Sequence, residues 1–161
     1  MFSRKESLTA APEDAPLIST EVRLPEPAIL TCGQPIPLRM LVTTLNALED
    51  HLSIQSLQLD IVGSTHVRAH DVHRTETNGT VLISQSNMAV PLRFPLASKE
   101  SFIDPKLWSS QIIPNTLPPS FETCNIRRSY EVVARVGISY TPPGMMVRSF
   151  TMHESHSIDH D

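Results

Sequence analysis

Two groups of histidines are the residues whose types and spacing could do chemistry. They lie in the segments HVRAHDVH and HESHSIDH, and the six imidazoles are those of His66, His70, His73, His153, His156 and His160. Three imidazoles held together can bind zinc or copper. On an extended strand, however, His66 and His70 share one face roughly 13 Å apart, too far for one metal ion. Surface histidines at a strand end and in a tail are therefore the favoured interpretation, with metal binding as the weaker alternative.

Nucleophilic catalysis has little basis in this sequence. The chain contains no G-x-S-x-G segment, and Cys124 stands between Thr123 and Asn125 without a histidine nearby in sequence. Cys32 is the only other cysteine, and in a reducing cytosol both are expected to be free thiols. A histidine brought to Cys124 by the fold would make a thiol enzyme. The sequence nevertheless predicts a protein that is not an enzyme and uses no cofactor.

Composition narrows the classes of partner and the location. The chain has 161 residues, enough for one domain, and aromatic residues are only 5% of it, so the core must be aliphatic. A formal charge of -4 gives no electrostatic reason to expect nucleic acid or direct attachment to an anionic membrane. The N-terminal residues lack the apolar core of a signal peptide, and no apolar run could span a bilayer. We therefore expect a cytosolic protein.

The elements that must position these residues are predicted to be strands. Fourteen prolines leave little room for helices. Apolar residues alternate with polar ones in three segments, and the clearest stripe is Tyr130, Val132, Ala134, Val136, Ile138 and Tyr140. Asn78-Gly79 is a typical hairpin turn. We predict strands over 35–46, 52–70, 106–113, 130–140 and 145–158, with a hairpin turn at 78–79.

About seven strands with no helical pattern predict a single all-β sandwich. Residues 1–18 are polar and without periodicity, and are expected to form a disordered lead. The sandwich is expected to cover residues 19–157, and residues 158–161 are expected to fray. Predicted strands of about a dozen residues are longer than usual, which indicates an elongated sandwich.

The segment Pro118-Pro119-Ser120-Phe121 has two possible roles. As a docking peptide it would form a polyproline helix for a WW or SH3 groove, but those grooves usually bind P-x-x-P or P-P-x-Y. As part of the fold, the prolines would end one strand and lead the chain into the next. The structural role is favoured, because the strand that follows is too apolar to remain undocked.

Three segments together resemble an arrestin-type domain, most closely that of the fungal arrestin-related proteins (α-arrestins). They are LPEPAILTCGQPIPLRMLVTTLN, LSIQSLQLDIVGSTHVRAH and IIPNTLPPSFETCNIRRSYEVVARVGISY. In that family a proline-containing segment follows a long loop and leads into a central strand. The matching residues here are Leu117, Pro118, Pro119, Ser120, Ile126 and Tyr130. The resemblance covers about residues 20–157 and implies one immunoglobulin-like sandwich, most similar to the C-terminal arrestin domain.

The resemblance also implies a function. Arrestin-type proteins are adaptors that bind cytosolic segments of membrane transporters or receptors in endocytosis and signalling. The α-arrestins bring in a ubiquitin ligase through P-P-x-Y motifs, which this chain lacks. If the chain is itself ubiquitinated on a lysine, the acceptors are Lys5, Lys99 and Lys106. The resemblance therefore predicts a cytoplasmic adaptor, at the plasma membrane or endosomes when bound to cargo. A sandwich-type binding module unrelated to trafficking is the alternative.

Overall fold

The chain folds into two antiparallel sheets. The computed structural model describes residues 17–44, 52–95, 97–140 and 148–158, the last of these by backbone only. The small sheet has the strand order β1–β2–β6, with β1 at Ile18–Arg23, β2 at Arg39–Thr44 and β6 at Glu100–Phe102. The large sheet has the order β4–β3–β8–β7, with these bounds: β3 Leu52–Ala69, β4 Val72–Gln85, β7 Phe121–Glu122 and β8 Ile126–Tyr140. On its margins β5 (Val90–Pro91) pairs with β3, and β9 (Arg148–Ile158) pairs with β8.

One aliphatic core fills the space between the two sheets. Val22, Met40 and Val42 enter it from the small sheet, and Leu57 and Leu59 enter it from the large one. The predicted stripe on β8 is buried as expected, since its members are 0–3% exposed except for the half-buried Tyr130: Val132, Ala134, Val136, Ile138 and Tyr140. The predicted all-β sandwich, with a core made mainly of aliphatic side chains, is thereby confirmed.

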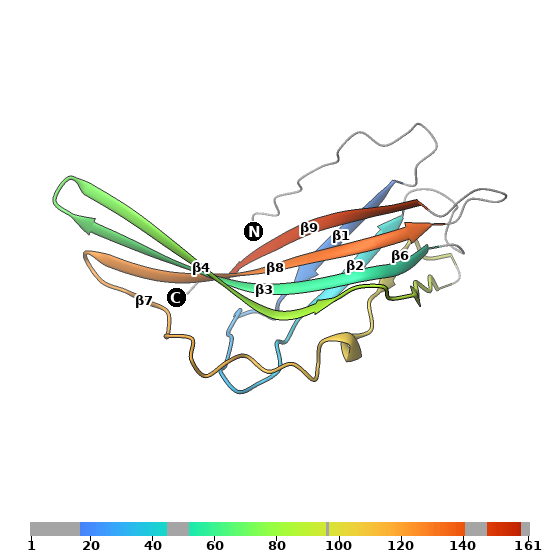
Figure 1. The fold of residues 1–161 in the computed structure, drawn as a ribbon, viewed down its shortest axis with the longest axis horizontal. Coiled ribbons are helices and arrows are strands. Elements are labelled where there is room, and N and C mark those ends of the chain that lie inside the picture. The colour runs from blue at the N-terminus through green and yellow to red at the C-terminus, as the bar shows by residue number, and fades with distance from the viewer. Residues whose placement is uncertain (1–16, 45–51, 96, 141–147, 159–161) are drawn as a thin grey trace.

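Three strands of the large sheet are unusually long. The lengths of β3, β4 and β8 are 18, 14 and 15 residues. Figure 1 shows that the β3–β4 hairpin and the start of β8 extend well beyond the small sheet. The predicted strands over 52–70 and 130–140 are confirmed, and β8 begins four residues earlier than expected, at Ile126.

The hairpin turn predicted at Asn78-Gly79 is wrong. Both residues lie inside β4, where Gly79 pairs with Val62, and the turn is made by His70 and Asp71. His70 has φ 53°, a left-handed conformation that the first residue of a tight hairpin turn often requires. The buried pair Leu59–Ile83 fixes the register. Counting outward from that pair, with the one-residue register shift that puts Val81 opposite Asp60, brings the turn to residues 70–71.

The strand predicted over 106–113 is also wrong. This segment begins as a short 3₁₀ helix at Pro105–Leu107, whose start is capped by the Asp104 side chain accepting from Lys106 N at 3.0 Å. Trp108 follows and is 1% exposed. Two of the apolar residues that indicated a strand, Trp108 and Ile113, are therefore buried by a compact connection that packs against the core, while Ile112 is exposed.

The remaining predictions divide between described and undescribed residues. The strand predicted over 35–46 is confirmed for 39–44, and the one over 145–158 is confirmed for 148–158. β1 already begins at Ile18, while the rest of the predicted lead, 1–16, and the terminal residues 159–161 lie outside the described part of the chain. Within the described residues, no helix is long and apolar enough to cross a membrane.

Candidate functional site

The projecting end of the large sheet is the candidate site, and we call it the arm. It consists of residues 63–69 of β3, the hairpin turn at 70–71, residues 72–78 of β4, residues 126–130 of β8, and β7 with the turn that follows it. The core stripe of β3 ends at Ile61, after which its side chains become progressively exposed. In β4, every residue from 72 to 79 is exposed. The arm is therefore held by strand pairing rather than by burial in the core.

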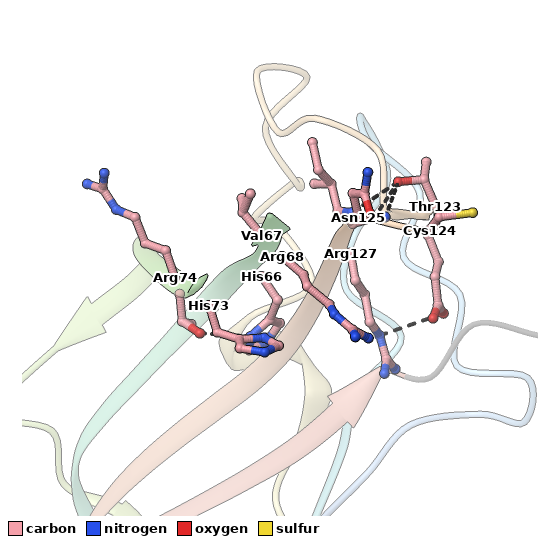
Figure 2. Close-up of a pocket in the computed structure, with 12 residues that line it drawn as sticks. His66, Val67, Arg68, His73, Arg74, Thr123, Cys124, Asn125 and Arg127 are labelled. Atoms are coloured by element: carbon pink, nitrogen blue, oxygen red, sulfur yellow. Dashed lines mark hydrogen bonds and ion pairs between the residues drawn. The ribbon is translucent and has the colours of Figure 1, made fainter. Parts of the chain in front are cut away.

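One face of the arm gathers basic and imidazole side chains. The strand register places His66 beside Thr75 on β4 and Arg127 on β8, and places Arg68 beside His73. Because alternate residues share a face, His66, Arg68, His73 and Arg127 all point to the same side. Figure 2 shows these four side chains gathered around a shallow hollow, while Arg74 points away. The hollow has a volume of about 190 Å³. We call them the tip face.

Polar contacts orient this face. The His66 Nδ1 and the Thr75 hydroxyl lie 2.9 Å apart and share a hydrogen bond. Arg127 Nε lies 3.8 Å from Glu122 Oε2, a loose ion pair at a surface where both side chains are more than half exposed. Such exposed pairs contribute little to stability. The Arg127 guanidinium is therefore available to another anion at little energetic cost.

The turn between β7 and β8 closes the rim of the hollow. The Thr123 hydroxyl accepts from Ile126 N at 3.0 Å, and Thr123 N donates to the Ile126 carbonyl at 2.8 Å. Arg68 N donates to the Asn125 carbonyl at 2.7 Å, which ties the turn to β3. A side-chain-stabilised turn of this kind holds its loop in one conformation. The tip face thus has a defined border on the β7 side.

Arg128 and Tyr130 occupy the opposite face of the arm. The Arg128 guanidinium carbon lies 5.2 Å from the centre of the Tyr130 ring, a cation–π contact, and Arg128 Nη1 donates to the Thr65 hydroxyl at 2.8 Å. Arg128 Nε donates to the Tyr130 hydroxyl, which in turn donates to the Pro118 carbonyl. This chain of contacts fastens the proline segment to the end of β8.

The six residues that carry the family resemblance lie in the segment that leads into β7 and in the first part of β8. Leu117 is half-buried and packs against the core, while Pro118 and Pro119 are exposed. Ser120 is half-buried just before β7, and Ile126 begins β8. The segment runs as an ordered connection into β7, in keeping with the structural role. The strand that was expected directly before this segment is absent, because residues 106–113 form the compact connection.

Charge distinguishes the arm from the rest of the chain. The whole chain has a formal charge of -4. Within the arm, four arginines stand against three acidic residues, for a net +1 with histidines neutral: Arg68, Arg74, Arg127 and Arg128 against Asp71, Glu76 and Glu122. The arm is thus the cationic end of an otherwise acidic protein.

The histidine clusters do not assemble a metal site in the described residues. His66 and His73 line the same hollow, but His70 is held in the hairpin turn. No group of three His, Cys, Asp or Glu side chains suited to a metal is found in the part of the chain described. His153 and His156 lie in β9, whose side chains are not described, and His160 falls outside the described residues.

The cysteines and the lysines of the described residues lie at exposed positions. Cys124 lies on the rim of the hollow, and its Sγ points away from His66 and His73 (Figure 2). Cys32 is exposed on another loop. Lys99 and Lys106 are both exposed, and Lys5 lies outside the described residues.

Sequence reasoning grouped His66 with His73 as possible metal ligands but did not join Arg68 or Arg127 to them. Their proximity depends on two non-local pairings, β3 with β4 and β3 with β8. The signal that could have joined them is the full length of the alternation in β3, which continues to Val67 and requires equally long partners. No protein-family model matches this chain, and no match was found among curated proteins.

Proposed function

We propose that this chain is a non-enzymatic adaptor module of the arrestin type, with an immunoglobulin-like sandwich that carries a recognition arm. It binds cytosolic segments of membrane transporters or receptors, and works with a ubiquitin ligase or other trafficking proteins in endocytosis or signalling. The protein acts in the cytoplasm and reaches the plasma membrane or endosomes through its cargo. Three residue segments support the arrestin assignment, and the Tyr130–Pro118 contact fits the structural role of their proline motif.

The tip face is the observation that carries the binding proposal. Two arginines and two imidazoles lie on one exposed face, around one hollow, at the end of an extension of the sheet. In a chain of net negative charge, such a face favours acidic protein segments and steers them to one end of the molecule. Since these groups are solvated, the affinity should be modest and should fall with salt.

Reversing the two tip arginines should weaken this binding. We expect the Arg68→Glu/Arg127→Glu variant to bind a fluorescently labelled glutamate-rich peptide at least tenfold more weakly than the unaltered chain, on the order of 1.4 kcal/mol or more. Fluorescence anisotropy at low and physiological salt measures the affinity. Circular dichroism checks that the variant is folded.

A matched control is offered by two exposed arginines outside the arm. Arg39 lies on β2 and Arg93 follows β5, so Arg39→Glu/Arg93→Glu makes the same change in net charge elsewhere. This control should keep the affinity within about twofold at physiological salt, where the Debye length is about 8 Å. Equal losses in both variants, or no binding by the unaltered chain, would refute the tip face as the acidic-peptide site.

A further inference from the structure

The outer edge of β4 is long and open. β4 has 14 residues, and among the described strands only β3 pairs with it. Its residues from 72 to 79 are exposed, and Figure 1 shows this half projecting beyond the small sheet. An edge strand presents a row of backbone N–H and C=O groups that can pair with a strand from another chain. This edge belongs to the arm but is distinct from the tip face.

Two opposite charges lie symmetrically on the exposed half of this edge. Arg74 and Glu76 flank Thr75, and Arg74 Nη2 lies 2.7 Å from Glu76 Oε1. Their side chains are 75% and 58% exposed, so this ion pair contributes little and can be exchanged for an equivalent one. The sequence Arg74-Thr75-Glu76 reads positive, neutral, negative. In an antiparallel copy of the strand the order is reversed, so each charge can face the opposite charge.

We propose that β4 pairs antiparallel with β4 of a second copy of this chain, with Thr75 opposite Thr75. This register places Arg74 of each copy opposite Glu76 of the other. It pairs residues 72–78 of both copies, which is nearly the whole exposed run. The proposal does not depend on the adaptor function.

Backbone geometry and charge together select this register. In β4, alternate residues direct their N–H and C=O groups to β3, and only the others can bond a strand on the outer edge. A symmetric pairing must therefore be centred on a residue, and three centres lie within the charged stretch. Centring on Arg74 or on Glu76 puts like charges directly opposite each other, which is destabilising. Only the centre at Thr75 puts each charge opposite its complement.

Such a dimer would double the tip face. Edge-to-edge antiparallel pairing has its two-fold axis perpendicular to the sheet, so the same face of both copies points to one side. His66, Arg68, His73 and Arg127 of each copy would then belong to one continuous sheet of twelve strands, six from each copy. Two linked copies of a weak site gain avidity for a partner with two acidic segments.

The experiment uses the full chain and two single charge reversals, Arg74→Glu and Glu76→Arg. The paired segment is short, so the expected association is weak, with a Kd on the order of 10–100 µM. Sedimentation equilibrium over that range should show a monomer–dimer equilibrium for the unaltered chain. Each variant alone should self-associate at least about tenfold more weakly than the unaltered chain, because it places two like-charge pairs in the interface. Both sites are exposed, so folding should be retained.

Mixing the two variants provides the decisive measurement. The Arg74→Glu copy carries two glutamates and the Glu76→Arg copy carries two arginines, so their heterodimer has every charge paired. An equimolar mixture should therefore associate at least as tightly as the unaltered chain. Arg39→Glu, outside the arm, should leave dimerisation unchanged. A monomeric unaltered chain, variants that dimerise normally, or a mixture that stays monomeric would each overturn the proposed interface.

Discussion

Replacing Trp108 with alanine is expected to lower the free energy of unfolding by about 3–5 kcal/mol. Trp108 is the only tryptophan, it is 1% exposed, and it lies in the connection between β6 and β7 rather than in a strand. This connection is tied to the loop at residues 33–34, since Gly33 N donates to the Ile113 carbonyl at 2.8 Å and Ile113 N donates to the Gln34 carbonyl at 2.9 Å. The surroundings can relax only partly, so a large cavity remains.

Urea unfolding followed by circular dichroism measures this loss without requiring tryptophan fluorescence. Phe102→Ala is the matched control, because Phe102 is an aromatic residue on neighbouring β6 and is 62% exposed. It should change the free energy of unfolding by about 0.5 kcal/mol or less. In the unaltered chain, Trp108 should fluoresce at the short wavelengths of a buried indole. A Trp108→Ala variant as stable as the Phe102→Ala control would contradict the burial described for Trp108.

Adding a methyl group at Gly63 should destabilise the chain by about 1–3 kcal/mol. Gly63 lies opposite Tyr130, and a Cβ there would stand 2.8 Å from the Tyr130 ring and 3.1 Å from Arg128 Nη2. The ring cannot move freely, because its hydroxyl donates to the Pro118 carbonyl and accepts from Arg128. Gly63→Ala therefore forces the ring away and weakens the attachment of the proline segment.

A double-mutant cycle isolates the clash. In a Tyr130→Ala background the obstructing ring is absent, so Gly63→Ala should then be close to neutral, with a coupling of about 1–2 kcal/mol. The matched control is Gly79→Ala, since a Cβ at Gly79 would meet no atom within 4 Å. Urea unfolding provides all the free energies. An equal effect of Gly63→Ala in both backgrounds would show that Tyr130 does not lie over this glycine.

The parts of the fold that were predictable depend on local periodicity. The strands over 52–70 and 130–140 could be predicted because one side of each is buried, which imposes alternation directly on the sequence. The strand predicted over 106–113 was wrong because burial of Trp108 and Ile113 needs only apolar side chains, and these occur equally in a compact connection. The alternation of apolar and polar residues that is typical of a strand is weak in this segment.

The candidate site was less predictable, because it is made by pairing between distant segments. The turn signal at Asn78-Gly79 was locally strong but was outweighed by register: the buried pair Leu59–Ile83 leaves the turn to His70 and Asp71. Only that turn brings His73 beside Arg68. Arg127 joins the site through β8, about sixty residues further along the chain.

The central claim is that the tip face recruits acidic segments of membrane proteins for trafficking, and affinity purification with mass spectrometry tests it most directly. The C-terminally tagged chain would be compared with Arg68→Glu/Arg127→Glu and with the control Arg39→Glu/Arg93→Glu, each in cells that natively express the protein. The account predicts transporters, receptors or ubiquitin ligases with the unaltered chain and the control, and their loss from the tip variant. A partner set without such proteins, or one that the tip variant retains in full, would contradict it.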